Sequence, residues 1–199
     1  MWWKLLEKNA EELRSQIPAA VDTSAKIATS AVLSGNVTVG KNTQICHNAF
    51  IEGPVWIGDN CLIGNNTMMR GPLRIGDGSR IGFSTEIKNS VIGKRVLIGP
   101  QCFVADSVVE DEVYLGAMVR TSNQRLDRKT ISVLHEGVLQ DTKLDKLGCY
   151  IGVQASLGIQ VIIFPGRIVA PHSLFGPRIN IEKNLPTGHY MLKQELVVS

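Results

Sequence analysis

Aromatic side chains are scarce in this sequence of 199 residues, and long apolar runs are absent. Only 6% of the residues are aromatic, whereas 44% are hydrophobic and 19 are glycine. No apolar run approaches the roughly 20 residues that a membrane-spanning helix needs, so we expect no membrane as partner. A core of small and branched side chains, with few rings, suits a regular repeat better than an irregular globule.

Cysteine is also sparse, and charge of either sign is balanced. The four cysteines form no CxxC pair and share no metal-ligand spacing with a histidine, which predicts reduced thiols, a cytoplasmic location and no bound metal. A net charge of +3 allows a local anion site but does not favour nucleic acid as partner. The first 18 residues have acids early and no uninterrupted apolar segment, so we do not expect a signal peptide.

What the sequence does contain is a six-residue repeat. From Ile27 to Ile87 an apolar lead residue recurs at every sixth position without a miss. Helices repeat every 3.6 residues and strands every two, so neither explains the period. The pattern is typical of a triangular solenoid in which lead residues point inward and glycine or asparagine tolerates positive φ at the corners. Three hexads make one coil of about 18 residues, and coils stack as parallel strands roughly 4.8 Å apart.

Two steps of the repeat shorten to five residues, from Ile87 to Ile92 and from Val104 to Val109. The pattern then stops over 122–147 and resumes from Ile151 to Ile181, which gives about seven coils. An interruption of this length predicts a loop excursion that stands off the solenoid and carries function. Within it, the segments on either side of His135-Glu136-Gly137 predict a β-hairpin.

The chain therefore divides into three parts. We predict an amphipathic helix within residues 1–20 that caps the open end of the first coil, a β-helix over 21–185 and a finishing tail over 186–199. The apolar residues at near-helical spacing are Trp2, Leu5, Leu6, Leu13 and Ile17, followed by Pro18.

Three charged residues follow lead residues at intervals of 18. Glu52, Arg70 and Lys88 are therefore expected to stack along one edge of the solenoid. One interpretation is an anion cradle in which Arg70 and Lys88 bind phosphate. The other is a solvated ion ladder in which Glu52 neutralises Arg70.

Several longer strings resemble a known family. IEGPVWIGDNCLIGNN, MMRGPLRIGDGSRIGFSTEIKNSVIG, SNQRLDRKT before the hairpin, LGCYIG and IIFPGR are similar to the C-terminal acetyltransferase domain of bifunctional glucosamine-1-phosphate acetyltransferase/UDP-N-acetylglucosamine pyrophosphorylase, especially its archaeal-type branch. The resemblance covers nearly the whole chain from about residue 45. No glycine-rich phosphate loop precedes that point, so we expect no uridylyl transfer.

The resemblance carries expectations about fold and site. It implies an all-β fold, a single-stranded left-handed parallel β-helix, which is an exception to the usual right-handed crossover. It also implies a homotrimer with an active site at each subunit boundary and acetyl-CoA as co-substrate. Arg70 and Lys88 match the family's sugar-phosphate ligands, while Asn123 and Lys129 match substrate contacts of the excursion.

The sequence departs from the family where the catalytic base should be. In place of Gly/Pro-His-x-x-Tyr it has Gly99-Pro100-Gln101-Cys102-Phe103, so Pro100 replaces the histidine and Phe103 replaces the tyrosine of the substrate site. Loss of a positioned base costs about 10²–10⁴ in rate. We expect acetyl transfer to an amino-sugar phosphate or nucleotide sugar, with His135 or a neighbouring subunit's histidine as candidate base. The alternative is a non-catalytic sugar-phosphate-binding or scaffold trimer.

Overall fold

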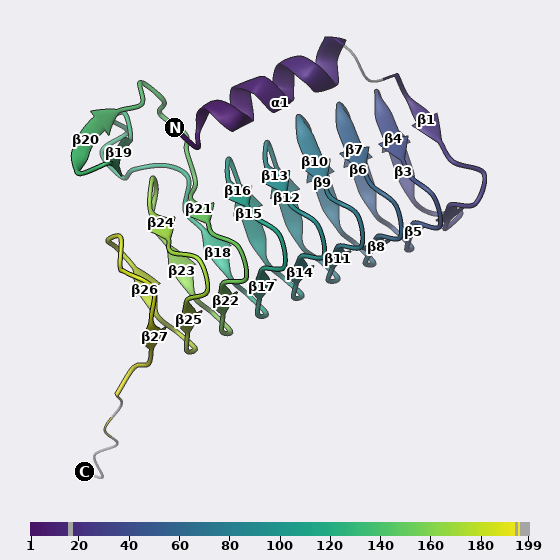
Figure 1. The fold of residues 1–199 in the computed structure, drawn as a ribbon. Helices are drawn as coiled ribbons and strands as arrows, with labels where there is room; N and C mark the ends of the chain where they lie inside the picture. Colours follow the sequence, from purple (N-terminus) through teal and green to yellow (C-terminus); the bar gives the residue numbers. More distant parts are fainter. Residues whose placement is uncertain (16–17, 194, 196–199) are drawn as a thin grey trace.

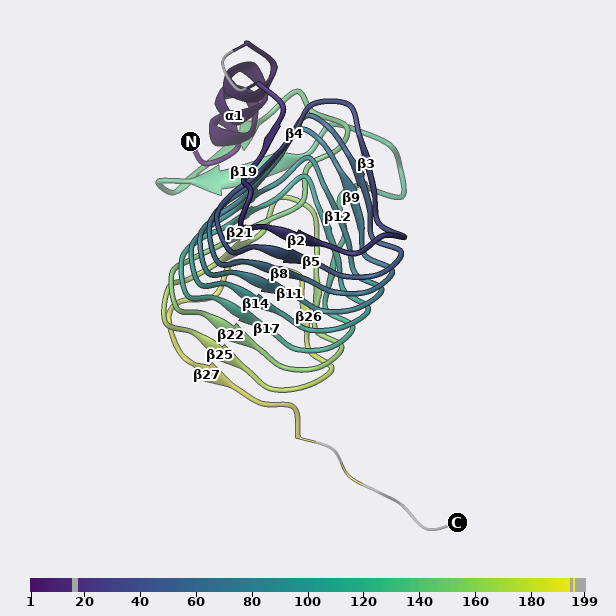
Figure 2. The same ribbon diagram turned by 90° about the vertical axis from the view of Figure 1, so that its right-hand side faces the viewer.

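The six-residue repeat folds into a stack of triangular coils in the computed structural model, which describes residues 1–15, 18–193 and 195 (Figure 1, Figure 2). Each of the three faces is a parallel sheet, with eight, nine and eight strands in this described part of the chain. The predicted left-handed parallel β-helix is confirmed. The number of about seven coils is too low, because Ala20–Val21 and His189–Tyr190 form strands outside the regular apolar repeat.

The strands follow the three faces in turn. The first face contains β1 (Ala20–Val21), β4 (Val37–Val39), β7 (Val55–Ile57), β10 (Leu73–Ile75), β13 (Val91–Ile92), β16 (Val108–Val109), β21 (Tyr150–Ile151) and β24 (Ile168–Val169). The second face contains β2 (Lys26–Ile27), β5 (Gln44–Ile45), β8 (Leu62–Ile63), β11 (Arg80–Ile81), β14 (Leu97–Ile98), β17 (Tyr114–Leu115), β22 (Ser156–Leu157), β25 (Leu174–Phe175) and β27 (His189–Tyr190). The third face contains β3 (Val32–Ser34), β6 (Phe50–Glu52), β9 (Met68–Arg70), β12 (Glu86–Lys88), β15 (Phe103–Ala105), β18 (Arg120–Thr121), β23 (Ile162–Ile163) and β26 (Asn180–Ile181).

Lead residues fill the interior, as the repeat predicts. Ile57 pairs with Ile75, 18 residues on, whereas Ile75 pairs with Ile92, 17 residues on, because of the shortened step. All three side chains are buried. The core is therefore a column of stacked branched side chains. Each contributes about 25 cal/mol of stabilising free energy per Å² of apolar surface removed from water.

The corners distinguish asparagine from glycine. Asn60 and Asn66 have φ of 56° and 55°, as expected for left-handed corner positions. The glycines that follow lead residues were expected to tolerate the same conformation, but their φ is not positive. They serve close packing instead: a Cβ on Gly64 would lie 2.8 Å from the Ile81 carbonyl oxygen of the next coil. The spacing between coils therefore excludes a side chain there.

The N-terminal helix α1 (Lys4–Ser15) lies along the first face, and the prediction that it caps the open end is wrong (Figure 1). The guanidinium of Arg74 on β10 donates to Asn9 Oδ1 at 3.0 Å and to Glu12 Oε2 at 3.1 Å. Leu6 and Leu13 are buried on the side facing the sheet. Twelve residues of helix span about 18 Å, which matches several strands of the stack and exceeds one coil.

The ends of the solenoid are finished differently. The first-coil lead residue Ile27 stays half-buried, whereas at the other end Tyr190 of β27 stacks on Phe175 with ring centroids 4.7 Å apart. Predicted Ile17 of the helix and most of the tail beyond Lys193 lie outside the described residues. In the part of the chain that the structure describes, no helix has the length and apolarity to span a membrane.

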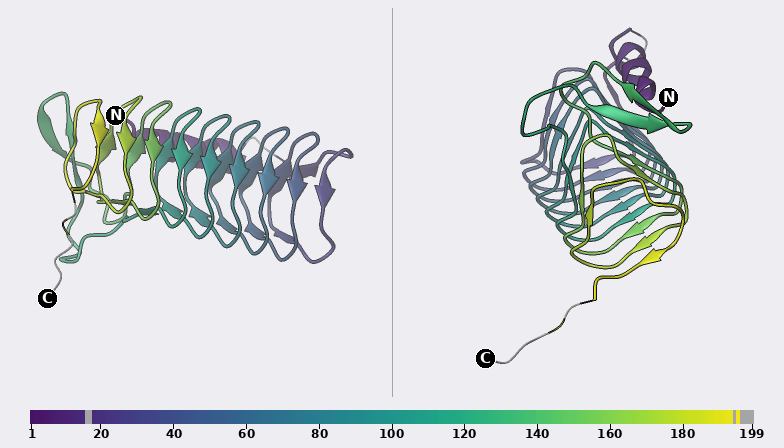
Figure 3. Two further views of the ribbon diagram at one scale, coloured as in Figure 1. Left: turned by 90° about the horizontal axis from the view of Figure 1, so that it is seen from below. Right: turned by 90° about the vertical axis from the view of Figure 1, so that its left-hand side faces the viewer.

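The excursion leaves the corner between the third and first faces after Thr121 and returns at Tyr150. Its predicted hairpin is confirmed as β19 (Ser132–His135) paired antiparallel with β20 (Val138–Asp141). The hairpin lies beside the start of α1, outside the coils (Figure 3). Ile131 and Val133 of the excursion are buried against Trp2, Trp3 and Leu6.

Candidate active site

The predicted ladder of charges lies on the third face. Glu52, Arg70 and Lys88 occupy equivalent positions in β6, β9 and β12, and the strand pairing confirms that they stack. The ion-ladder interpretation required Arg70 to pair with Glu52, but Arg70 has a different partner. Its guanidinium instead donates to the carboxylate of Glu86, which points outward from β12 two residues before Lys88.

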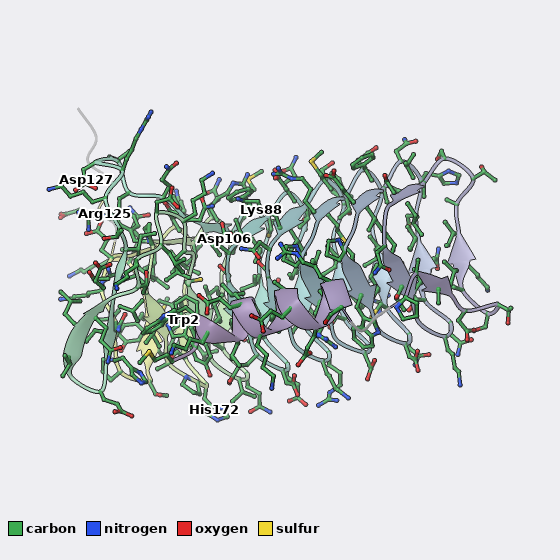
Figure 4. All side chains as sticks on the ribbon, turned by 90° about the horizontal axis from the view of Figure 1, so that it is seen from above. Trp2, Lys88, Asp106, Arg125, Asp127 and His172 are labelled. Carbon is green, nitrogen blue, oxygen red and sulfur yellow. The ribbon has the colours of Figure 1, made fainter. Side chains whose placement is uncertain are left out.

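Lys88 and Asn123 meet at a buried carboxylate. Asp106, in the corner after β15, accepts from Asn123 Nδ2 at 2.5 Å and from Asn89 Nδ2 at 2.6 Å. Lys88 Nζ lies 3.3 Å from its Oδ2, and the two side chains point toward one another (Figure 4). Only 4% of Asp106 is exposed, so this anion depends on these partners for stabilisation.

Asp106 also fixes the neck of the excursion. The backbone N–H of Gly148 donates to its carbonyl at 2.8 Å, and the N–H of Leu147 donates to the Asn123 carbonyl at 2.9 Å. The loop therefore leaves and re-enters the solenoid at a defined point beside Lys88. Two residues predicted as ligands from separate strings, Lys88 and Asn123, are brought together.

A cavity of about 540 Å³ adjoins the ladder on the third face. Its lining residues are Ser84, Glu86, Gln101, Cys102, Phe103 and Arg120. Predicted Phe103 is therefore beside Glu86 and Arg120 on adjacent strands. Arg120 donates to the backbone carbonyl of Gln101, next to Pro100, so the corner that lacks the histidine borders this cavity.

One guanidinium, that of Arg120, and one carboxylate, that of Glu86, line the cavity, and Arg70 adjoins it through Glu86. Arg120 donates to backbone carbonyls and has no carboxylate partner among the described residues. Arg70 pairs with the carboxylate of Glu86. Nε of Arg70 is buried without a hydrogen-bond partner. Burial raises the pKa of the Cys102 thiol to about 11, so this sulfur stays protonated at neutral pH.

The other predicted site residues lie apart from this cavity. Lys129 is exposed on the excursion, where its N–H donates to Asp127 Oδ1 at 3.2 Å. Hydrogen bonds from Arg125 to Asp127 keep the pKa of Asp127 far below its usual range and order this turn. His135 packs edge-on to Trp3, with ring centroids 6.1 Å apart, and so faces the helix side of the hairpin.

The remaining histidines, His47, His172 and His189, are exposed. Figure 4 shows His172 on the opposite side of the molecule from Lys88 and Asp106. Within the described residues no group of three or more His, Cys, Asp or Glu side chains could hold a metal ion.

A second groove of about 560 Å³ lies between the excursion and the last coils, and the sequence did not predict it. Ile162 and Phe164 expose apolar surface there, while Arg125 and Arg167 supply charge. Burial, together with nearby Arg125, lowers the pKa of Arg167. The sequence could have indicated this groove only through apolar residues at outward-facing positions near the end of the third face.

Three site residues were also missed: Glu86, Asp106 and Arg120. The alternation of β12 and the 17-residue step would have placed Glu86 and Arg120 on either side of Phe103. Asp106 had no comparable signal, since its partners come from a loop whose path the repeat does not determine.

Comparison with known proteins identifies several relatives. Residues 54–89 match the family described as bacterial transferase hexapeptide (six repeats), and residues 36–68 match the hexapeptide repeat of succinyl-transferase. The uncharacterized acetyltransferase YaiX of Escherichia coli O6:K15:H31 (strain 536) is 50% identical over 98% of this chain and 89% of its own length.

More distant relatives are longer or more divergent. The bifunctional protein GlmU of Methanococcus aeolicus is 32% identical over 98% of this chain, which spans about half (47%) of that protein. Among solved structures, LpxA, a UDP-N-acetylglucosamine acyltransferase from Bacteroides fragilis, aligns with a TM-score of 0.45 and 16% identity, covering 84% of this chain and 69% of LpxA.

Proposed function

Because the chain belongs to the hexapeptide-repeat acetyltransferase family, we propose that it transfers an acetyl group from acetyl-CoA to the amine of a sugar phosphate or nucleotide-linked amino sugar. The observation that carries this proposal is the cavity on the third face, with guanidinium groups in and beside its lining. Arg120 is in its lining and Arg70 lies beside it, and Glu86 is the one carboxylate among these three side chains.

An anionic acceptor suits this balance of charge. A phosphate would compete with Glu86 for the exposed part of the Arg70 guanidinium, and charge-assisted bonds to guanidinium are stronger than neutral ones. Lys88 and Asn123 border the same face through Asp106, and Phe103 offers a ring edge to a sugar. Lys129 lies apart from this cavity, next to Asp127 of the second groove, and would contact substrate from the excursion.

The second groove suits the acyl donor. Its apolar residues Ile162 and Phe164 would contact the aliphatic arm of CoA. The lowered pKa of Arg167 reflects an unfavourable, half-buried cation that a donor phosphate would stabilise. The YaiX relatives are named as acetyltransferases, which supports acetyl-CoA as co-substrate.

We place this reaction in the cytoplasm, where acetyl-CoA is available and the four free cysteines would stay reduced. We also propose a homotrimer, since the exposed apolar residues Leu134, Val138 and Leu139 of the hairpin would be covered by a neighbouring subunit.

One observation favours a second function. Pro100 has no proton-accepting side chain, so a trimer that binds sugar phosphates without turnover is the alternative. Both functions predict ligand binding, and only acetyl transfer predicts release of free CoA.

The test is a panel of amino-sugar phosphates and nucleotide-linked amino sugars incubated with acetyl-CoA and monitored for thiol release. We expect slow turnover with at least one amine, because binding and orientation alone lower the barrier by several kcal/mol. The double variant Pro100→His, Phe103→Tyr should raise the rate, provided that its unfolding temperature shows an intact corner. No thiol release from wild type with any acceptor, and none from the folded double variant, would establish the binding function instead.

A further inference from the structure

Among the side chains that line the third-face cavity, one carries a group that can act as a base. Of its lining residues, Ser84 and Gln101 are not bases, Phe103 is apolar and Arg120 is a permanent cation. The Cys102 thiol is protonated and buried. The carboxylate of Glu86 remains.

The geometry holds this carboxylate toward the cavity. Ile87 points into the core, so its neighbours Glu86 and Lys88 point outward from β12. Strand pairing sets Glu86 between Met68 and Phe103. Arg70 donates to one of its oxygens, while 31% of the side chain stays exposed to the cavity. The carboxylate is therefore oriented yet accessible.

Other bases are less suitable. Asp106 has 6% of its side chain exposed, and its carboxylate already pairs with Lys88 and accepts hydrogen bonds from Asn89 and Asn123. His135 lies against Trp3 on the hairpin, and its described neighbours do not line the cavity.

We propose that Glu86 is the catalytic base of the acetyl transfer, in the role that a histidine at position 100 would have had; this inference rests on the function proposed above. The amine lone pair attacks the thioester carbonyl carbon, forming the C–N bond and an oxyanion. Glu86 takes the proton from the nitrogen. The oxyanion then re-forms the carbonyl, the C–S bond breaks, and the CoA thiolate leaves and is protonated, with Glu86 returning its proton to solvent.

The nature of the base restricts the acceptor. A carboxylate is a weaker base than an imidazole, so it is poorly suited to remove the proton of a hydroxyl nucleophile. After an amine attacks, however, the nitrogen carries a positive charge and its proton is acidic enough for a carboxylate. A Glu86 base therefore selects an amine over a hydroxyl acceptor.

The experiment compares Glu86→Gln with Glu52→Gln, a matched control in which a carboxylate of the same face is removed outside the cavity. We expect kcat of Glu86→Gln to fall by about 10²–10⁴ with the KM for acetyl-CoA unchanged, and the control to keep its rate. In Glu86→Ala, added formate should restore part of the lost rate, since it supplies a carboxylate beside Arg70. Unfolding temperatures establish that each variant is folded.

The outcomes separate the two proposals. Turnover by wild type together with a kcat for folded Glu86→Gln within threefold of wild type would overturn the role of Glu86 alone. The role of Glu86 would also be overturned if kcat fell equally in Glu52→Gln. A comparable fall of kcat in His135→Gln, together with no rescue of Glu86→Ala by formate, would overturn it too. Absence of turnover by wild type would remove the proposed function and this inference with it.

Discussion

Arg70 and Lys88 occupy equivalent positions on adjacent strands, yet their carboxylate partners hold them with different strength. In the Arg70–Glu86 pair, 42% of the Arg70 side chain and 31% of the Glu86 side chain are exposed. Exposed ion pairs of this kind contribute roughly 0.2–1 kcal/mol to stability. In the Lys88–Asp106 pair the exposures are 21% and 6%, and breaking a buried pair costs about 3–5 kcal/mol. An incoming phosphate would therefore compete for Arg70 far more easily than for Lys88.

This difference leads to a prediction about anion binding. Arg70→Ala should weaken binding of a sugar phosphate or sulfate by about 1.5–3 kcal/mol, the scale of a charge-assisted hydrogen bond. Isothermal titration calorimetry measures the change. Arg80→Ala, which removes an exposed guanidinium from β11 on the second face, is the control and should bind as wild type does. Equal affinities for Arg70→Ala and wild type would show that Arg70 serves the ion pair only.

At this scale the sequence determined positions better than partners. The interval of 18 residues predicted that Glu52, Arg70 and Lys88 stack, because one coil separates them. It did not predict that Arg70 turns toward Glu86, since that choice depends on side-chain rotamers across two strands. The register contained enough information to place the missed residues Glu86 and Arg120 beside Phe103, whereas the anchoring of Asn123 on Asp106 required the path of the loop.

At the scale of elements, α1 and the hairpin stabilise each other. Trp2, Trp3 and Leu6 pack with Ile131 and Val133 in a cluster separate from the main core. These segments are more than 100 residues apart in sequence, so a repeat that encodes contacts between successive coils contains no information about them. The helix was recognised from its spacing, but its location was not.

The cluster predicts a local effect of mutation. Trp3→Ala should destabilise the packing of the hairpin by about 3–5 kcal/mol, the usual cost of truncating a buried large aromatic side chain. Hydrogen exchange should accelerate in β19, β20 and the excursion, while the strands of the solenoid keep their protection. Leu5→Ala, on the exposed side of the same helix, should leave exchange unchanged. Uniform acceleration over all coils would contradict a local role for the cluster.

At the scale of the whole molecule, the three faces differ in how they are covered. The first face carries α1, whereas the third leaves Val32, Phe50 and Met68 exposed in one continuous row across β3, β6 and β9. Their side chains are 49%, 37% and 41% exposed. This row leads directly to Glu86 and Phe103, so a subunit packed against it would also border the cavity.

We therefore expect a homotrimer, with light scattering at micromolar concentration giving about three times 21.7 kDa. Phe50→Glu should shift the mass toward that of the monomer, because a buried, unpaired charge opposes association. Leu97→Glu, at a comparably exposed position on the second face, is the control and should stay trimeric. A stable wild-type monomer would refute the assembly. If the monomeric variant stays folded and loses acetyl transfer while the control keeps it, the neighbouring subunit completes the site beside Glu86.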